Sequence, residues 1–230
     1  MSASPSRAGD LPRRGPLLSD RVKEAARALL APLVRLAQRL GITPNRVTII
    51  GFCVVVVAAG LVGAGQLLIG AAILVAGSLL DAVDGALARA TGGSTAFGSF
   101  LDSTLDRAAE AILYIGIVVY FLRASADPLA PVLLALAALC GSFMVSYTRA
   151  KAEAIGVSAS VGIAPRTERL VLVVAGIGLA GLGLEIGLTG AIGIIAALAA
   201  ATTVQRIWHV RQQVEESLRA AGTGDITQER

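Results

Sequence analysis

Four aspartates in a mostly apolar stretch are the residues whose types and spacing could do chemistry. Asp81 and Asp84 lie three residues apart, and Asp102 and Asp106 lie four apart, so each pair shares one face of a helix. Ionised carboxylates are costly in apolar surroundings unless positive charge compensates them, and the arginines nearby are too few to do so. Carboxylate oxygens are ligands that magnesium, manganese and calcium accept. The four acids therefore predict a site for divalent cations.

The composition indicates that this site is held inside a membrane. Of the 230 residues, 55% are hydrophobic and only 16% are charged, and the mean hydropathy is +0.73. Soluble domains carry about 25% charged residues, so we predict an all-α integral membrane protein with one integral domain. A single histidine, His209, argues against zinc chemistry that relies on histidines. Cys53 and Cys140 lie in apolar runs, and we interpret them as small core residues rather than a disulfide.

The elements that must position the aspartates are six transmembrane helices preceded by an N-terminal amphipathic helix. Residues 1–17 are polar and are expected to form a disordered tail. Residues 18–41 combine an apolar stripe with a basic face, which predicts an amphipathic interfacial helix against membrane lipids, kinked at Pro32. A solvated helix packed on its own protein is the alternative. The transmembrane catalytic domain covers residues 42–212. Residues 213–230 are expected to form a cytoplasmic C-terminal tail, whose part up to Arg219 could continue the last helix. The spans are predicted at about 46–65, 67–91, 97–122, 128–150, 168–185 and 188–210.

Basic residues gather on one side of the predicted spans. Nine of the twenty Lys and Arg residues precede position 47, and others flank the 150–168 connection and the C-terminal end. Cytoplasmic segments carry an excess of such residues, so we expect a multi-pass protein of the cell membrane with both termini in the cytoplasm. The aspartates lie on the second and third spans, near the turn at residues 92–97. This places the active site on the cytoplasmic side, where nucleotides are available.

The second and third spans should pack as an antiparallel hairpin because the turn between them is short. Asp84 lies about two helical turns before that connection and Asp102 about one turn after it, so the four carboxylates can converge on one or two cations. Gly85 and Gly98 leave space for a ligand, and Arg89 could meet a phosphate. Metal ions here could neutralise a diphosphate while a carboxylate deprotonates an alcohol. The alternative is that the acids line the path of a divalent-cation transporter.

Residues 81–106 match the pattern D-x-x-D-G-x-x-A-R-x8-G-x3-D-x3-D, which resembles the signature of the CDP-alcohol phosphotransferase family of integral membrane enzymes. The resemblance implies six transmembrane helices, a homodimer, and transfer of a phosphatidyl group from a CDP-linked lipid to an alcohol with release of CMP. It also implies a binuclear site for Mg2+, with Mn2+ as an alternative, and no nucleic-acid partner. By motif position, Asp81, Asp84 and Asp102 resemble metal ligands. Asp106 resembles both a metal ligand and the catalytic base that deprotonates the acceptor hydroxyl.

The resemblance extends to positions that contact the CDP-lipid in the family. One group forms the turn before the first span, and the others lie near the aspartate motif. The matched positions are Asn45, Arg46, Val47, Thr48, Gly85, Arg89 and Thr95. Two of them have ordinary alternatives, since Asn45 could cap the first span and Thr95 the third. The two roles can coexist.

A basic region around the connection between the fourth and fifth spans suits an acceptor that carries phosphate. It resembles the branch of the family that makes phosphatidylinositol phosphate or archaetidylinositol phosphate, which implies CDP-diacylglycerol as donor and inositol 1-phosphate as acceptor. The matched acceptor-phosphate contacts are Arg149, Lys151, Arg166 and Arg206, with Pro165 where the branch commonly has Glu. One alternative is glycerol 3-phosphate as acceptor, as in phosphatidylglycerophosphate synthase. Another is that the basic residues only anchor anionic lipid headgroups. For Glu110 two readings remain open, supporting the aspartates or pairing with Arg107.

Overall fold

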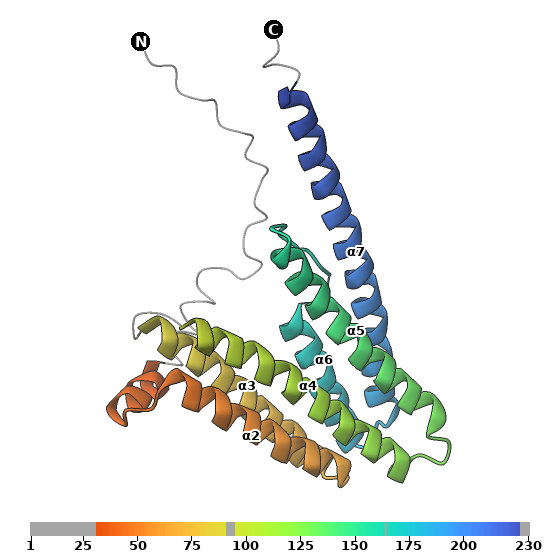
Figure 1. Cartoon of the computed structure of the whole chain (residues 1–230). Coiled ribbons are helices and arrows are strands. Elements are labelled where there is room, and N and C mark those ends of the chain that lie inside the picture. The colour runs from red at the N-terminus through yellow and green to blue at the C-terminus, as the bar shows by residue number, and fades with distance from the viewer. Residues whose placement is uncertain (1–30, 91–94, 164, 226–230) are drawn as a thin grey trace.

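The computed structural model describes residues 31–90, 95–163 and 165–225, and in these ranges the chain consists of helices and short connections (Figure 1). Residues 31–39, which belong to the segment predicted as an amphipathic helix, are helical. The predicted disordered tail and the start of that helix lie outside the described residues. The helices that follow are α2 (Pro44–Gly63), α3 (Leu67–Ala90), α4 (Ala96–Ala124), α5 (Leu129–Ala154), α6 (Arg166–Gly181) and α7 (Ile186–Asp225).

The predicted spans match these helices closely, except at the end of the last one. Predicted and observed ends differ by at most four residues from the first span to the start of the sixth. α7 continues to Asp225 and has 40 residues, so most of the predicted C-terminal tail is helical. At 1.5 Å per residue α7 is about 60 Å long, about twice the thickness of a bilayer's hydrocarbon core. Only about half of α7 can therefore lie in that core.

Local sequence explains where the helices that carry the site begin. α2 starts at Pro44, whose missing N–H is no loss in a first turn, and Thr43 occupies the capping position in extended conformation. The alternative that Asn45 caps α2 is therefore wrong. Thr95 caps α4, because its Oγ1 accepts a hydrogen bond from the Gly98 N–H at 2.9 Å. The capping alternative for Thr95 is confirmed.

Helices α2 to α7 form two groups that pack against each other. α2 packs against α3 and α4, whereas α7 packs against α5 and α6. Contacts between α3 and α6 and between α4 and α5 join the two groups (Figure 1). The main core includes the fully buried side chains of Val62, Ile117, Ile177, Leu188 and Ile192. A smaller core near the start of α2 consists of Ala37, Val47, Val83 and Leu87.

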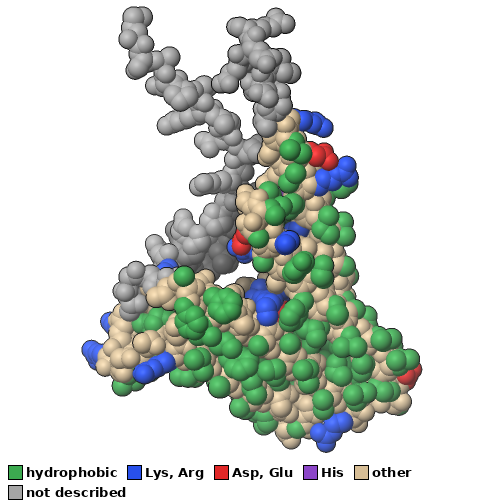
Figure 2. Space-filling model, viewed as in Figure 1, with side chains coloured by type: hydrophobic (Ala, Val, Ile, Leu, Met, Phe, Trp, Pro, Cys, Tyr) green, Lys and Arg blue, Asp and Glu red, His purple; other side chains and the backbone are tan. Residues whose placement is uncertain are grey.

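Four of the described helical segments are long and apolar enough to cross a membrane. They are Pro44–Gly63, Leu67–Arg89, Leu129–Ala154 and Ile186–Arg219. Many large apolar side chains are exposed, and Figure 2 shows them covering much of the lower part of the molecule. The chain is therefore a multi-pass membrane protein.

The count of six spans is not confirmed by this criterion. α4 contains five charged residues along its 29 positions, and α6 has only 16 residues. The structure also corrects the interpretation of the two cysteines. Cys53 and Cys140 are both exposed rather than buried in the core.

Candidate active site

Three of the four aspartates come together near the end of α3 and the start of α4. Asp81 from α3 and Asp102 and Asp106 from α4 each offer one carboxylate oxygen, and these oxygens lie within 4.8 Å of one another. Asp102 and Asp106 are one turn apart and share a face of α4, as the spacing predicts. The expected close packing of the second and third spans on each other is not observed among the described residues, where α2 packs against both α3 and α4. Oxygens at such separations can bind one ion together.

The surroundings of Asp102 favour a cation at this point. Its Oδ1 is buried and has no hydrogen-bond partner among the residues that the structure describes. Buried carboxylate oxygens are nearly always paired, so an oxygen of this kind calls for a partner from outside the chain. A set of three carboxylates suits Mg2+ or Mn2+. The residues present therefore fit a divalent metal.

Asp84 lies beside this group rather than in it. Its side chain is buried, and its Oδ2 accepts a hydrogen bond from Thr48 Oγ1 at 2.9 Å. This bond joins the first turn of α2 to α3. Asp84 and Thr48 also line both cavities of the site, so they stand between them.

A groove formed by the starts of α2 and α4 and the end of α3 gathers most of the positions matched to the CDP-lipid. Its lining residues are Thr43, Pro44, Asn45, Thr48, Asp84, Gly85, Ala88, Arg89, Thr95, Gly98, Ser99 and Asp102. Five of the seven matched positions are among them, from three different helices. The other two are placed elsewhere. Arg46 is exposed and is not part of this lining, and Val47 is buried in the small core with Val83 and Leu87.

Gly98 permits a close approach at the edge of this groove. A Cβ atom at this position would lie 2.9 Å from Asn45 Oδ1 and 3.1 Å from Thr95 Oγ1. Real Cβ atoms essentially never come as close as 2.9 Å to another atom, so a side chain here would push Asn45 away. The motif glycine is thus explained by the packing of α2 against the first turn of α4.

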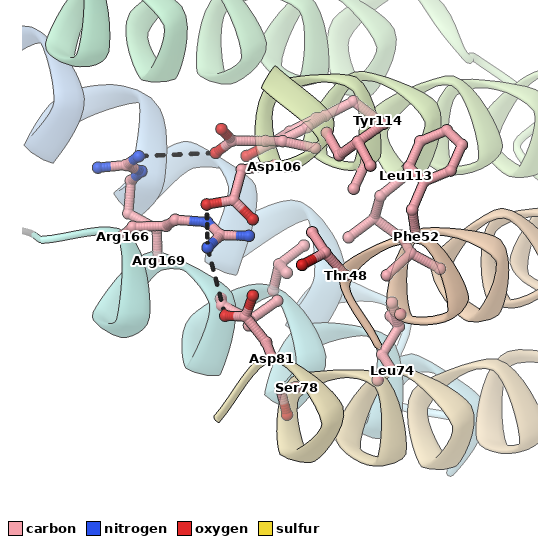
Figure 3. A pocket seen from close by; sticks show the side chains of 18 of the residues that line it. Thr48, Phe52, Leu74, Ser78, Asp81, Asp106, Leu113, Tyr114, Arg166 and Arg169 are labelled. Carbon is pink, nitrogen blue, oxygen red and sulfur yellow. Dashed lines mark hydrogen bonds and ion pairs between the residues drawn. The ribbon is translucent and has the colours of Figure 1, made fainter. Parts of the chain in front are cut away.

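A second cavity extends from the aspartates into the bundle between α2, α3, α4 and α6 (Figure 3). Asp81, Asp106 and Arg166 line its polar side, whereas Phe52 and Leu113 lie on its apolar side. A few convergent polar groups in a mostly apolar cavity are typical of ligand sites. Such a cavity can bring charged reacting groups next to hydrocarbon.

Arg166, the first residue of α6, points at the acid cluster. Its Nη1 lies 2.5 Å from Asp106 Oδ2 and 3.4 Å from Asp81 Oδ2. The side chain is 36% exposed, so solvent and solutes can reach it. The residue predicted to bind the acceptor phosphate therefore lies at the same point as the residue predicted to act as base.

Arg206 on α7 is placed differently. It is buried, and its guanidinium donates hydrogen bonds to the carbonyl oxygens of Val161, at 2.8 Å, and of Val145. These bonds attach α7 both to α5 and to the connection that leads into α6. Two of its donors are thus used within the protein, and the guanidinium helps to hold that connection in place.

The last two predicted acceptor contacts lie near the end of α5. Arg149 is exposed and its Nε lies 2.8 Å from Glu153 Oε1, one turn further along the helix. Lys151 is also exposed. The structure therefore brings Arg166 to the acid cluster but does not place all four cations in one group.

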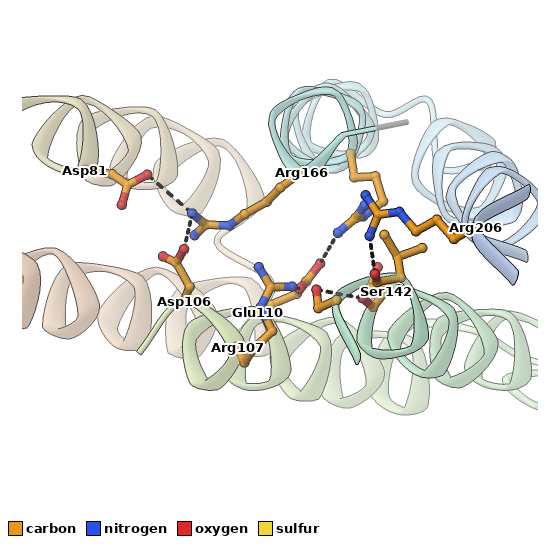
Figure 4. Close-up of polar contacts among 10 residues, drawn as sticks. Asp81, Asp106, Arg107, Glu110, Ser142, Arg166 and Arg206 are labelled. Atoms are coloured by element: carbon orange, nitrogen blue, oxygen red, sulfur yellow. Dashed lines mark hydrogen bonds and ion pairs between the residues drawn. The ribbon is translucent and has the colours of Figure 1, made fainter. Parts of the chain in front are cut away.

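An ion pair between buried Arg169 and partly buried Glu110, which the sequence analysis did not predict, joins α4 and α6. Arg169 Nη2 lies 3.6 Å from Glu110 Oε1, and Glu110 also pairs with Arg107 (Figure 4). Of the two readings for Glu110, pairing with Arg107 is confirmed, and Arg169 is added as a second partner. The available signal was spacing, because Glu110 follows Asp106 by four residues and Arg169 follows Arg166 by three.

Known proteins resemble this chain in sequence. Residues 41–207 match the family described as CDP-alcohol phosphatidyltransferase. Archaetidylinositol phosphate synthase from Methanothermobacter thermautotrophicus is 40% identical over 181 residues, which cover 78% of this chain and 89% of that one. Phosphatidylinositol phosphate synthase from Corynebacterium glutamicum is 34% identical over 187 residues, which cover 80% of this chain and 85% of that one.

A solved structure resembles this chain in fold. Phosphatidylinositol phosphate synthase from Mycobacterium tuberculosis with CDP-DAG bound gives a TM-score of 0.74 at 33% identity, over 80% of this chain and 94% of that one. The same protein in complex with manganese and citrate gives a TM-score of 0.74 at 33% identity, over 79% and 88% of the two chains. That relative therefore combines this fold with a CDP-lipid and, separately, with a divalent metal.

Proposed function

Because the chain belongs to the CDP-alcohol phosphatidyltransferase family, we propose that it transfers the phosphatidyl group of CDP-diacylglycerol to a hydroxyl of inositol 1-phosphate. The products are phosphatidylinositol phosphate and CMP. One observation carries this proposal. The groove lined by Asn45, Thr48, Gly85, Arg89 and Thr95 reaches the aspartate cluster at Asp102, with Asp84 beside it, and Arg166 contacts that cluster from the other side.

The groove is the proposed site of the CDP part of the donor. Asn45 and Thr48 offer hydrogen-bonding groups to the nucleotide, and Gly85 lets the donor approach the α3 backbone. Arg89 supplies a guanidinium suited to the diphosphate. Val47 supports this site from the small core, where it packs with Val83 and Leu87 of α3. Arg46 keeps its proposed contact with the donor from the exposed side of α2.

The aspartates are the proposed metal ligands. Asp81, Asp102 and Asp106 would hold one Mg2+ together, and Asp84 would join them to hold a second, with Mn2+ able to replace Mg2+. Divalent metals, when bound, neutralise the charge of the diphosphate and of the departing CMP. Asp84 is already held by the hydrogen bond from Thr48, so its carboxylate has a defined direction.

Asp106 is the proposed base. The hydroxyl oxygen of the acceptor forms a bond to the phosphorus that carries diacylglycerol, and the bond from that phosphorus to the CMP oxygen breaks. The hydroxyl proton goes to the Asp106 carboxylate. The carboxylate lines the cavity and faces Arg166, so a phosphorylated acceptor bound to Arg166 would have a hydroxyl within its reach.

The acceptor phosphate is proposed to bind Arg166, with Arg149, Lys151 and Arg206 contributing positive charge. Arg166 is the best placed of these, because it is partly exposed and lies at the acid cluster. Arg206 uses part of its guanidinium to hold the connection before α6, and its remaining donors add to the field at this end. A dianionic phosphate is the acceptor group that such cations would select.

The proposal includes six spans, with both termini and the active site on the cytoplasmic side, and a homodimer. In α4, residues 111–122 are uncharged, and the side chains of Arg107 and Glu110 are only 22% and 14% exposed. These two charges of α4 thus avoid lipid by facing the protein, as intramembrane charges generally do. Labelling of introduced cysteines from each side of the membrane tests the orientation, and cross-linking in native membranes tests the dimer.

The deciding experiment is CMP release by the purified protein with Mg2+, CDP-diacylglycerol and one acceptor at a time. We expect release with inositol 1-phosphate and little with free inositol, since the cations require a phosphate. Release with glycerol 3-phosphate alone would assign the chain to phosphatidylglycerophosphate synthesis instead. Absence of CMP release with every alcohol would reject the proposal, and the Asp106→Asn variant is the matched control for background hydrolysis.

A further inference from the structure

α4 and α6 face each other across the second cavity with two acids and two bases in register. α4 presents Asp106 and Glu110 one turn apart, and α6 presents Arg166 and Arg169 one turn apart. Arg166 lies 2.5 Å from Asp106, and Arg169 lies 3.6 Å from Glu110 (Figure 4). The two helices are thus linked by an outer ion pair at the acid cluster and by an inner pair one turn deeper.

The two pairs differ in their access to solvent. In the inner pair the side chains of Arg169 and Glu110 are 4% and 14% exposed, whereas in the outer pair those of Arg166 and Asp106 are 36% and 18% exposed. Glu110 is held further by Arg107 on its own helix. Separating a buried pair leaves charges without water or partner, so the inner pair resists exchange. The outer pair can exchange Arg166 for other partners at lower cost.

The position of Arg166 depends on how α6 is held relative to α4. Arg166 is the first residue of α6 and directly follows Pro165. No helical turn therefore precedes Arg166 to hold it in place. The α6 backbone packs on α3 and α7, while both α4 and α6 line the cavity between them. Arg169 reaches across this cavity one turn below Arg166 and fixes that turn to Glu110.

We propose that Glu110 and Arg169 are positioning residues that hold Arg166 over Asp81 and Asp106. They act through Arg166 and not by touching the donor or the acceptor. This inference rests on the proposed function, in which Arg166 binds the acceptor phosphate. It assigns a role to two charged residues that lie outside the aspartate motif.

The first test is a double-mutant cycle on acceptor kinetics. Glu110→Gln keeps the shape of the side chain and removes its charge, so Arg166 should lose its fixed position. We expect the KM for inositol 1-phosphate to rise about tenfold, as is usual when a residue that orients a ligand contact is replaced, with little change in the KM for CDP-diacylglycerol. In an Arg166→Ala background the same change should raise the acceptor KM no further. An equal rise in both backgrounds would mean that Glu110 acts independently of Arg166, and no rise would also overturn the proposal.

The second test measures Mn2+ affinity by electron paramagnetic resonance and needs no acceptor. Arg166 competes with a metal ion for the carboxylates of Asp81 and Asp106, so releasing it should tighten Mn2+ binding. We expect Glu110→Gln and Arg166→Ala to lower the Mn2+ dissociation constant, and the double variant to lower it no further. Damage to the fold would instead weaken metal and acceptor binding together. Weaker or unchanged Mn2+ binding in Glu110→Gln would therefore overturn the inference.

Two further variants keep both tests decisive. Glu215→Gln removes an equivalent charge from the exposed Arg211–Glu215 pair on α7, and it should change neither measurement. If Glu110→Gln does not fold, Arg169→Lys takes its place, because it retains the charge and loses the planar guanidinium. Arg169→Lys should also raise the KM for the acceptor and lower the Mn2+ dissociation constant, and neither effect should appear in an Arg166→Ala background. A wild-type protein that shows no activity with inositol 1-phosphate would reject the proposed acceptor. The Mn2+ cycle would still confirm or overturn the positioning role.

Discussion

Replacing Gly98 with alanine should weaken donor binding while leaving the fold intact. The added methyl group would lie 2.9 Å from Asn45 Oδ1 and 3.1 Å from Thr95 Oγ1. Thr95 is held by the hydrogen bond that it accepts from the Gly98 N–H, so Asn45 is the side chain that must move. Asn45 lines the groove proposed for the nucleotide, and its displacement changes the shape of that groove.

The size of the effect follows from two terms. Holding Asn45 away from a favoured rotamer costs about 0.5–1.5 kcal/mol. Losing one hydrogen bond to the donor costs about 0.5–1.5 kcal/mol more. Together they amount to about 1–3 kcal/mol, or about 5- to 150-fold in kcat/KM for CDP-diacylglycerol. Alanine is favoured over glycine within a helix by about 0.5–1 kcal/mol, which offsets strain in the fold.

The assay is CMP release as a function of CDP-diacylglycerol concentration at saturating acceptor. We expect kcat/KM for the donor to fall, with an unchanged KM for the acceptor and an unfolding temperature close to that of the wild type. Gly60→Ala in α2 is the matched control, because a Cβ there has nothing within 4 Å. Unchanged donor kinetics in Gly98→Ala would refute the assignment of the nucleotide to this groove.

Four other predictions test separate parts of the site. Asp106→Asn should reduce turnover by about 10²–10⁴-fold while calorimetry still detects CDP binding, and normal turnover would exclude Asp106 as the base. Chelation of divalent ions should abolish CMP release until Mg2+ or Mn2+ is restored; activity that survives chelation would contradict a metal at the aspartates. Arg206→Ala should lower the unfolding temperature, because the carbonyls of Val145 and Val161 lose a charged donor worth about 1.5–3 kcal/mol. Lys151→Ala should raise the KM for the acceptor without lowering the unfolding temperature. An equal fall in the unfolding temperature of Arg206→Ala and Lys151→Ala would contradict a structural role that is specific to Arg206.

The positions of the helices were predictable because they depend on local features. Apolar runs of span length are separated by glycine and proline breaks such as Gly63 to Gly65 and Pro128, and these features do not depend on the rest of the fold. The end of α7 was not predictable in the same way. Beyond the membrane, polar residues alternate without an apolar run, and the composition of such a stretch suits a solvated helix as well as a tail. Its helical state up to Asp225 is therefore a finding of the structure.

The aspartate cluster was predictable for a related reason. Spacings within α3 and α4 decide which carboxylates share a face. The short connection alone did not predict how the two helices are arranged, because both pack against α2 rather than closely against each other. The contact between Asp84 and Thr48 depends instead on the rotation of α2 about its axis, which no spacing within one helix determines. For Val47 the same rotation matters, because it turns this side chain into the small core while Thr48 faces the groove.

The basic residues were the hardest to place, because their charge predicts the side of the membrane on which they lie but not the partner to which each side chain points. Arg166 reaches the acids, Arg206 binds backbone carbonyls and Arg149 pairs with Glu153 on the surface, although all three lie at the same end of the molecule. Long side chains can reach partners in several directions, so their pairing depends on which acids the packing leaves within reach. The pair of Glu110 and Arg169 emerges only when α4 and α6 are seen together.

The balance of charges explains how Arg166 can pair with the aspartates and also bind the acceptor phosphate. Glu110 is paired with Arg107 and Arg169, so within the described residues the cation in contact with Asp81 and Asp106 is Arg166. In the proposed two-metal state, two divalent ions would neutralise the charge of four ionised aspartates, and the carboxylates would no longer need the guanidinium. Arg166 then becomes available to a phosphate on the acceptor. Metal and acceptor should therefore strengthen each other's binding, because both draw on the same ion pair, and linkage requires the effect to be reciprocal. The Mn2+ affinities of the wild type and of Arg166→Ala, each with and without inositol 1-phosphate, measure this coupling, and equal coupling in the two proteins would exclude Arg166 as its source.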